Sequence, residues 1–233
     1  MRALLLAAGL GTRLRPLTDR TPKCLVPIKG KPLLAYWFDL LLTGGIEKVL
    51  VNTHHLPEAV RVFVAQSRWR DRITLVHEDR LLGTGGTLLR NKGFFEGKPF
   101  LVAHADNLTW FDVEAFLRRH EQRPTATVIT MMTFRADTPQ SCGVVEEDNR
   151  GIVIAFHEKV PNPPGNRANA AVYIFEPEIL EFLGGLGKDF IDLSTEVIPH
   201  FLGRICTFPN STYHCDIGTP DSLRKAEREF LPK

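Results

Sequence analysis

The sequence lacks several features that mark whole classes of protein. Its 233 residues contain no apolar run near the roughly 20 residues of a membrane span. The N-terminal stretch ALLLAA is too short for a signal peptide and leads directly into a glycine turn. The formal net charge is only +2, so no overall field would attract nucleic acid or an anionic membrane. We therefore expect neither a membrane partner nor a nucleic-acid partner.

Cysteine is scarce, and its spacing is uninformative. The four cysteines form no CxxC pair, which argues against a disulfide framework and against a zinc site: Cys24, Cys142, Cys206 and Cys215. The sequence is typical of a reduced, cytoplasmic protein. It also has no internal repeat, and in particular no hexapeptide repeat. We expect one domain over residues 1–233 without a C-terminal β-helix.

Two common phosphate-binding motifs are missing as well. The pattern GxxxxGK[ST] does not occur anywhere in the chain. Gly9 and Gly11 match the first half of the dinucleotide motif GxGxxG, but Leu14 stands where the third glycine is required. The dinucleotide fingerprint therefore fails, and a kinase-type enzyme with a P-loop is disfavoured.

Apolar strand-like segments do alternate with amphipathic helical segments in the first half of the chain. The expected strands are residues 3–8, 46–53, 72–78 and 98–107, and the expected helices are 31–45, 57–66, 82–89 and 112–121. This alternation with short connections predicts an α/β fold with a Rossmann-like, mostly parallel sheet. We assign residues 1–124 to a nucleotide-binding half.

The pattern changes after about residue 125. Four strand-like segments follow closely, at 125–134, 143–148, 151–159 and 168–175, with DNRG as a turn between two of them. Two helices are expected at 176–183 and 194–202, and a last one at 219–230 with Thr219 or Asp221 near its N-cap. Residues 125–233 therefore predict a smaller, partly antiparallel half.

Basic residues are concentrated after the first strand. Residues 1–31 hold one acid, Asp19, and seven basic residues: Arg2, Arg13, Arg15, Arg20, Lys23, Lys29 and Lys31. In open α/β sheets, ligands lie beyond the carboxyl ends of the strands, and glycine-rich turns there expose N–H groups to anions. The loop after Ala8 therefore suits a triphosphate or a sugar phosphate. A solvated loop with ordinary surface charges is the alternative.

The spacing in this loop resembles a long and specific signature. Residues 9–32 read GLGTRLRPLTDRTPKCLVPIKGKP, similar to the sugar-1-phosphate nucleotidyltransferase family. Further segments resemble motifs of that family in the same order: LGTGG (82–86), HADN (104–107), CGVVEED (142–148), FHEK (156–159), NAAVYIF (169–175) and HCDIGTP (214–220). The resemblance spans essentially the whole chain and implies the nucleotidyltransferase fold. It also implies transfer of a nucleotidyl group from an NTP to a sugar-1-phosphate, with release of pyrophosphate.

The resemblance implies a role for each matching residue. Arg13 and Lys23 would be catalytic, Arg13 by holding the β- and γ-phosphates and Lys23 by stabilising charge at the α-phosphate. The nucleotide would be bound by Gly9, Gly11, Thr12, Arg13, Gly83 and Gly85. The sugar phosphate would be bound by Gly143, Glu158, Lys159 and Asn169. The cofactor would be Mg²⁺, held by Asp106 and Asp216, because this ion takes carboxylates together with substrate phosphates.

The chain departs from the family pattern at two of these places. Ala105 precedes Asp106 where the family usually has glycine, and Val160 follows Lys159 where the family has proline. The loop after residue 159 is therefore expected to differ in shape.

The choice of substrates stays open. The loop LGTGG with Glu78 before it looks more like the guanylyltransferase branch, so GTP is favoured. The alternatives are a UTP-dependent N-acetylmuramate-1-phosphate enzyme, a CTP-dependent enzyme for a non-sugar phosphate, and a catalytically silent regulator that binds nucleotide-sugars. A homodimer is compatible with the sequence.

Overall fold

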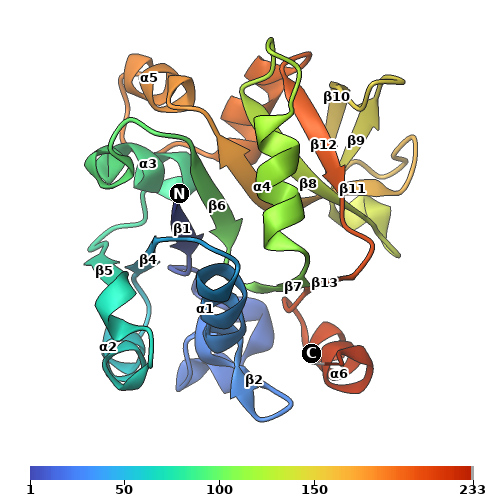
Figure 1. The fold of residues 1–233 in the computed structure, drawn as a ribbon. Helices are drawn as coiled ribbons and strands as arrows, with labels where there is room; N and C mark the ends of the chain where they lie inside the picture. Colours follow the sequence, from blue (N-terminus) through green and yellow to red (C-terminus); the bar gives the residue numbers. More distant parts are fainter. Residues whose placement is uncertain (232–233) are drawn as a thin grey trace. The chain divides into compact units, whose positions relative to one another are not determined.

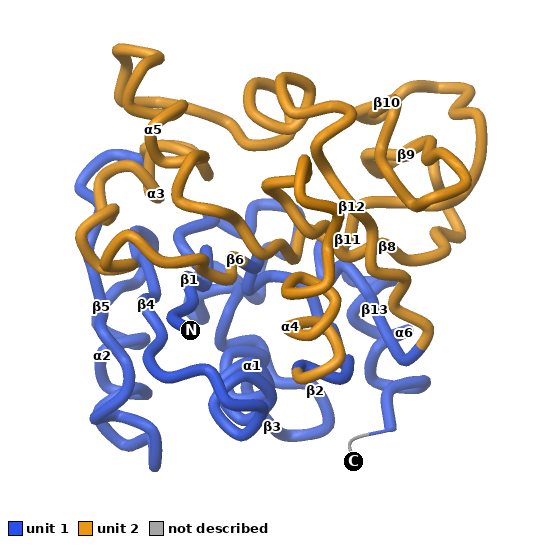
Figure 2. Tube along the Cα trace, turned by 45° about the horizontal axis from the view of Figure 1, so that its top comes forward, with its two compact units in different colours: residues 1–81, 103–113, 212–233 blue, residues 82–102, 114–211 orange. Residues whose placement is uncertain are grey.

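The computed structural model describes residues 1–231 and contains two compact units (Figure 2). The first unit is made of three separate segments: Met1–Leu81, Ala103–Val113 and the chain from Thr212 onwards. The second unit is made of two: Leu82–Val102 and Glu114–Ser211. Segments of the two units therefore alternate along the chain.

A parallel sheet with covering helices is the centre of the first unit. Its strands are ordered β1 (Arg2–Leu6), β4 (Lys48–Thr53), β5 (Ile73–His77), all parallel. The interior of β1 is completely buried, which explains the unbroken apolar run that encodes it. Along the chain, helix α1 (Leu33–Thr43) lies between β1 and β4, and helix α2 (Pro57–Gln66) lies between β4 and β5 (Figure 1). The predicted parallel α/β arrangement is confirmed here.

The strand expected over residues 98–107 is interrupted. β6 (Phe100–His104) ends before a turn at Ala105 and Asp106, and a new strand, β7 (Asn107–Trp110), begins directly after it. The Ala105 N–H donates to the Leu6 carbonyl at 3.0 Å, which anchors this turn at the carboxyl end of β1. The expected strand is therefore confirmed over Phe100–His104, and Asp106 lies in the turn that follows it.

The segment from Thr212 onwards returns to the first unit. β13 (Tyr213–Asp216) pairs antiparallel with β7, with Asp216 opposite Asn107. Helix α6 (Pro220–Glu229) follows, and its N-cap is Thr219, whose side chain accepts from the Ser222 N–H in a capping box. Two short strands, β2 (Pro27–Ile28) and β3 (Lys31–Pro32), form a hairpin in the same unit.

The second unit is partly antiparallel, as expected. β11 pairs antiparallel with β8 and β9, β9 pairs antiparallel with β10, and β12 runs parallel to β8. The bounds of these strands are β8 (Ile129–Arg135), β9 (Gly143–Glu147), β10 (Val153–Glu158), β11 (Arg167–Phe175) and β12 (Ile205–Pro209). The DNRG turn is confirmed, because the Asp148 carboxylate accepts from the Ile152 N–H at 2.9 Å and Gly151 has φ of 74°.

The helices of the second unit are regular except at one place. α3 (Gly83–Arg90), α4 (Val113–Glu121) and α5 (Glu178–Gly185) are α-helices, with α4 in this unit from Glu114. The helix expected at 194–202 consists of a π-helical turn, Leu193–Val197, followed by a 3₁₀ turn, Ile198–Phe201. Pro199 offers no N–H and its ring excludes the carbonyl four residues earlier, so a regular α-helix cannot pass through it.

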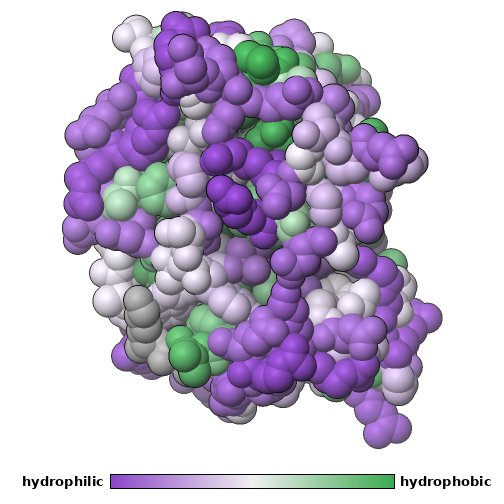
Figure 3. Space-filling model, turned by 90° about the vertical axis from the view of Figure 1, so that its right-hand side faces the viewer, coloured by the Kyte–Doolittle hydropathy of each residue, from purple (hydrophilic) through white to green (hydrophobic). Residues whose placement is uncertain are grey.

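The surface carries apolar side chains mainly one at a time. The face in Figure 3 is mostly hydrophilic, with apolar atoms in small groups. The large exposed apolar residues come from separate segments: Leu10, Leu17, Val62, Leu81, Ile154, Phe190 and Leu231. Such scattered residues are ordinary for a globular surface. Within residues 1–231, the structure holds no helix that is both long and apolar enough to span a bilayer.

Candidate active site

The glycine turn after β1 has one position that only glycine can occupy. Gly11 has φ of 63°, and a Cβ atom there would lie 2.9 Å from Thr18 Cγ2. Its carbonyl accepts from the Leu14 N–H at 3.0 Å and from the Thr18 hydroxyl at 2.7 Å. Gly9, by contrast, is exposed, and nothing lies within 4 Å of the place of its Cβ. The turn thus requires glycine at position 11, whereas position 9 has space for a side chain.

Lys23 is buried between two carboxylates. The residue is 6% exposed, and its Nζ lies 2.8 Å from Asp106 Oδ2 and 3.4 Å from Asp216 Oδ1. Burial raises the pKa of Asp106, but the charge and hydrogen bond of Lys23 outweigh this and hold that pKa below its usual value. The three residues come from the three separate segments of the first unit. The structure therefore brings together what the sequence keeps far apart.

Arg13 and Gly218 complete this cluster. Arg13 Nη2 lies 3.8 Å from Asp216 Oδ2, and the Arg13 side chain is 65% exposed. A Cβ at Gly218 would lie 2.8 Å from both of these atoms. Gly218 is therefore needed for the guanidinium and the carboxylate to meet, a role that sequence reasoning missed. Arg15, which also lies in the basic loop, forms a surface ion pair with Asp19 at 3.2 Å.

The cluster suits a metal ion whose remaining ligands are substrate phosphates. Within residues 1–231, no group of three or more His, Cys, Asp or Glu side chains could hold a metal ion alone. The two carboxylates of Asp106 and Asp216 nevertheless share one ammonium, so their positions already favour a positive charge between them. Mg²⁺ commonly binds through one or two carboxylates plus substrate phosphates. The donor set fits that pattern.

The alanine before Asp106 is compatible with this geometry. Ala105 is completely buried and is not among the residues with positive φ. A side chain at this position therefore causes no backbone strain, and the departure from the family's glycine leaves the turn intact.

A hydrogen-bonded chain links the ends of β1, β4 and β5. The Asn52 amide donates to Glu78 Oε1 at 2.9 Å, and Asn52 Oδ1 accepts from the Ala7 N–H at 2.7 Å. Asn52 and Glu78 are 2% and 6% exposed. Asn52 was not singled out from the sequence, although a polar residue at the end of the apolar run VLVN was the available signal. The chain fixes the start of the glycine turn relative to Glu78.

In the second unit, Glu158 and Lys159 lie at the end of β10. Lys159 Nζ is 3.0 Å from Glu158 Oε1, and the Lys159 side chain is 66% exposed. Lys159 has φ of 51°, and its N–H donates to the Cys142 carbonyl at 3.0 Å. A Cβ on Gly143 would lie 2.7 Å from Glu158 Oε2 and 2.5 Å from Phe156 Cζ. Gly143 and Glu158 are thus neighbours, as the resemblance implies.

Asn169 lies at a bulge in β11. The register with β8 shifts between Asn169 and Tyr173, and Ala171 within the bulge has φ of 54°. The Asn169 amide donates to the Tyr173 hydroxyl at 2.6 Å, and its Oδ1 accepts from the Ala171 N–H at 2.9 Å. Asn169 is therefore held rigidly by its own strand.

Gly83 and Gly85 have a packing role in the second unit. Gly83 has φ of 72°, and a Cβ there would lie 2.4 Å from the Ile191 carbonyl oxygen. The Gly85 N–H donates to that same oxygen at 2.9 Å. Glycine is thus required where the start of α3 meets the backbone of Ile191. Contact with a nucleotide stays a prediction for both residues.

Comparison with known proteins gives consistent matches. The model of the family described as Nucleotidyl transferase matches residues 2–232. The chain is 30% identical to a mannose-1-phosphate guanylyltransferase of Mycobacterium tuberculosis, over 98% of this chain and 64% of the relative. It is 30% identical to a UTP–glucose-1-phosphate uridylyltransferase of Synechocystis, over 85% of this chain and 54% of the relative. The chain therefore spans somewhat over half the length of these relatives.

Solved structures share the fold. The crystal structure of HddC from Yersinia pseudotuberculosis, complexed with GMP-PN, superposes with a TM-score of 0.82 at 24% sequence identity. The match covers 99% of this chain and 99% of that one. The mixed α/β fold expected from the sequence is confirmed.

Proposed function

The chain belongs to the nucleotidyl transferase family, and we propose that it transfers a nucleotidyl group from an NTP to a sugar-1-phosphate. The observation that carries the proposal is the convergence of Arg13, Lys23, Asp106 and Asp216 from three chain segments at one place in the first unit. We assign nucleotide binding to residues 1–124 and sugar binding to residues 125–233, except that Asp216 lies in the first unit and would serve the nucleotide.

The reaction needs charge neutralisation more than covalent catalysis. An oxygen of the sugar-1-phosphate attacks the α-phosphorus, the bond between the α-phosphorus and its bridging oxygen breaks, and the electron pair leaves with pyrophosphate. Arg13 is exposed beside the glycine turn, and its guanidinium fork suits the β- and γ-phosphates. Lys23 is buried, so its ammonium is little hydrated and would stabilise developing charge strongly.

Asp106 and Asp216 would hold the Mg²⁺ ion. The ion would neutralise phosphate charge in the bound nucleotide. The two acids also position Lys23, whose Nζ lies 2.8 Å from Asp106 Oδ2 and 3.4 Å from Asp216 Oδ1, so the ammonium would add its positive charge to that of the metal.

For the sugar phosphate we propose Gly143, Glu158, Lys159 and Asn169. The carboxylate of Glu158 and the amide of Asn169 suit sugar hydroxyls, and the exposed ammonium of Lys159 suits the phosphate. The rigid hold on Asn169 by Ala171 and Tyr173 supports this, because a fixed polar group discriminates between hydroxyl positions.

We propose GTP as the nucleotide, on the basis of Glu78. Its carboxylate is buried at the carboxyl end of β5 and already accepts one N–H from Asn52. Guanine offers two adjacent donors, N1–H and the N2 amino group, which a carboxylate can accept together. Uracil and thymine offer one N–H between two carbonyl oxygens, which a carboxylate would repel.

The first test is pyrophosphate release with Mg²⁺. Each of GTP, UTP, dTTP, CTP and ATP would be combined with mannose-, glucose-, heptose- and N-acetylmuramate-1-phosphate, and with phosphocholine. Release that depends on GTP and one sugar phosphate is expected. Release with CTP and phosphocholine would contradict the sugar assignment, and silence throughout despite NTP binding would contradict catalysis itself.

A second test addresses Glu78 directly. Glu78→Gln should lower kcat/KM for GTP at least about tenfold relative to UTP, because one good paired contact discriminates by about 1–3 kcal/mol. Asp79→Asn is the matched control, since Asp79 is the adjacent acid and its side chain is fully exposed. An unchanged ratio of GTP to UTP in Glu78→Gln would remove Glu78 from base selection.

A further inference from the structure

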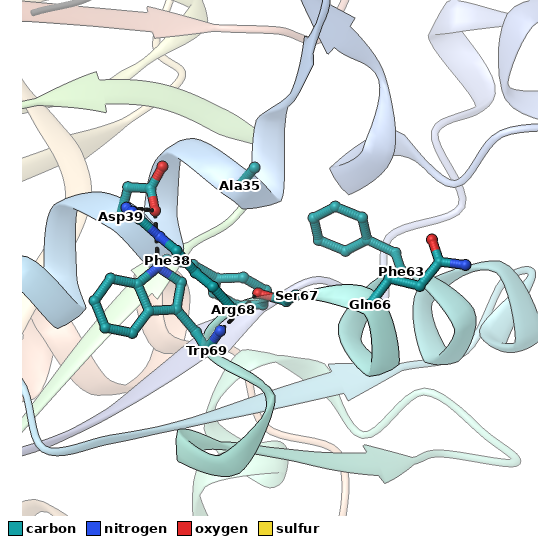
Figure 4. A pocket seen from close by; sticks show the side chains of 8 residues that line it. All are labelled: Ala35, Phe38, Asp39, Phe63, Gln66, Ser67, Arg68 and Trp69. Carbon is teal, nitrogen blue, oxygen red and sulfur yellow. Dashed lines mark hydrogen bonds and ion pairs between the residues drawn. The ribbon is translucent and has the colours of Figure 1, made fainter.

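A cavity of about 340 Å³ lies in the first unit (Figure 4). None of the residues that line it belongs to the cluster around Lys23. It is bordered by α1, by the end of α2 and by the turn that follows α2. Its principal side chains are Ala35, Phe38, Asp39, Phe63, Arg68 and Trp69. None of them is a candidate residue of the proposed reaction.

Asp39 organises the polar side of this cavity. Its Oδ2 accepts from Lys31 Nζ at 2.6 Å, and its Oδ1 accepts from Arg68 Nη2 at 2.6 Å and from Trp69 Nε1 at 2.7 Å. Burial raises the pKa of Asp39, but these hydrogen bonds outweigh it and lower that pKa. The carboxylate is thus ionised and surrounded by donors. Among the lining residues, Asp39 carries the one negative charge and Arg68 the one positive charge. Because Lys31 pairs with the other oxygen of Asp39, Arg68 is not the only cation that balances this carboxylate.

The apolar side is built from aromatic rings. Phe38 is 1% exposed, and its ring lies 6.1 Å from that of Phe63 with an interplanar angle of 17°. The indole of Trp69 is fixed by Asp39 and by two guanidinium groups, with Arg68 at 4.8 Å and Arg72 at 5.6 Å from the ring centroid. The wall is therefore preformed, as is usual for small-molecule sites.

Arg68 is the group that can reach a ligand. Its side chain is 69% exposed, and its contact with Asp39 is made through Nη2. A guanidinium carries five N–H donors in a planar fork that matches a carboxylate or a phosphate. Gln66 and Ser67 also line the cavity, but Figure 4 shows the Gln66 amide on the far side of Phe63 from the Arg68 guanidinium. Arg68 is therefore the main donor for an anion.

We propose that this cavity binds a small aromatic anion, that is, one planar ring carrying one carboxylate or phosphate. The ring would pack on Ala35 and Phe63, with the buried Phe38 supporting Phe63 from behind, and the anion would be bound by Arg68. The volume is at the small end of the 300–1,000 Å³ typical of ligand pockets, which suits one ring and one charged group. The proposal does not depend on the proposed function.

The test is calorimetric titration with benzoate and phenyl phosphate, which distinguish the two anions. Inorganic phosphate tests the anion without the ring, and benzyl alcohol tests the ring without the anion. We expect saturable binding of at least one aromatic anion, at least about tenfold tighter than either partial probe. Absence of binding by both aromatic anions at millimolar concentration, or equal binding of benzyl alcohol, would overturn the proposal.

Variants locate the binding. Arg68→Ala should weaken it at least about tenfold, and Arg68→Lys, which keeps the charge and loses the fork, should weaken it less. Arg70→Ala is the matched control, because Arg70 is an equally charged neighbour that does not line the cavity. Unchanged binding in Arg68→Ala refutes the site. Loss of binding in Arg13→Ala would show instead that the probe occupies the cluster around Lys23.

Discussion

The ammonium nitrogen of Lys23 lies 2.8 Å from Asp106 Oδ2, in an ion pair that joins residues 83 positions apart. The lysine is buried, and this contact holds it at the carboxyl end of β1, next to the turn that carries Arg13. A charge held in this way needs little rearrangement when a phosphate group approaches, and such preorganisation is a major source of catalytic rate.

Lys23→Ala should lower kcat far more than it weakens NTP binding. In the proposed reaction its contact with the α-phosphate would strengthen as charge develops, so its loss would raise the barrier and leave the ground state little changed. We expect kcat to fall about 100-fold or more and the KM for NTP to change only a few-fold. Steady-state pyrophosphate release measures both. Arg20→Ala, in the same loop and exposed, is the control, and equal losses in kcat and binding would refute the role of Lys23.

Asp106→Asn and Asp216→Asn should each raise the Mg²⁺ concentration needed for half-maximal activity at least about tenfold. An amide oxygen is a weaker ligand than a carboxylate and brings no charge to the ion. The measurement is a Mg²⁺ titration at saturating NTP. Asp221→Asn is the control, because Asp221 is exposed and bonded to Arg224. A midpoint that does not move would exclude the altered residue from the metal site.

Gly218→Ala should reduce activity without unfolding the protein. The added methyl would lie 2.8 Å from Arg13 Nη2 and Asp216 Oδ2, so these two groups must separate. We expect kcat/KM to fall at least about tenfold, since small misplacements of catalytic groups have large effects. Thermal unfolding should shift by little, because both affected side chains are exposed. Activity equal to that of the parent would mean that the contact between Arg13 and Asp216 is dispensable.

Ala171→Gly should stabilise the protein. Ala171 has φ of 54°, a conformation that costs an L-residue roughly 1–2 kcal/mol and glycine almost nothing. The greater freedom of glycine in the unfolded chain offsets part of the gain, so about 0.5–1 kcal/mol remains. Urea unfolding should show a higher midpoint at the same slope. Ala170→Gly is the matched control: Ala170 is buried and has no positive φ, so its substitution should destabilise.

Stability should decrease as the pH is lowered from about 6.5 to about 4, partly because of His120. Burial lowers the pKa of His120 from 6.5 to about 4. The neutral ring lies between Thr130 Oγ1 at 2.8 Å and Glu176 Oε1 at 3.1 Å. Above pH 6.5 neither state binds the proton. Between the two pKa values only the unfolded state binds it, which removes up to about 3 kcal/mol.

The variant His120→Gln isolates this contribution. It should flatten the dependence of the unfolding midpoint on pH in this range while lowering stability at pH 7. His214, whose pKa is lowered to about 3 by burial, leaves a residual slope in the variant. Parallel pH profiles for the parent and the variant would show that His120 is not the titrating group.

The sequence predicted the parts of the molecule that depend on local pattern. The buried run of β1, the helices between parallel strands and the cap at Thr219 follow from hydrophobic period and capping chemistry. The meeting of Lys23 with Asp106 and Asp216 was predicted only from the resemblance, because pairing of β13 with β7 is a long-range event that no local pattern encodes.

Gly218 and Asn52 were missed because their roles depend on close approach in space. The segment 194–202 was predicted as a helix without a type, and its division into a π-helical and a 3₁₀ turn at Pro199 follows from the missing N–H of proline.

The division of the first unit into three segments has a consequence for the protein during its synthesis. Lys23 leaves the ribosome early, Asp106 after the first eighty residues of the unit, and Asp216 only after the whole of Glu114–Ser211 has been made. A nascent chain can therefore fold its second unit while the first still lacks β13 and one of its two acids. If Asp216 is needed for the proposed reaction, nucleotide turnover would begin only when synthesis has passed residue 216.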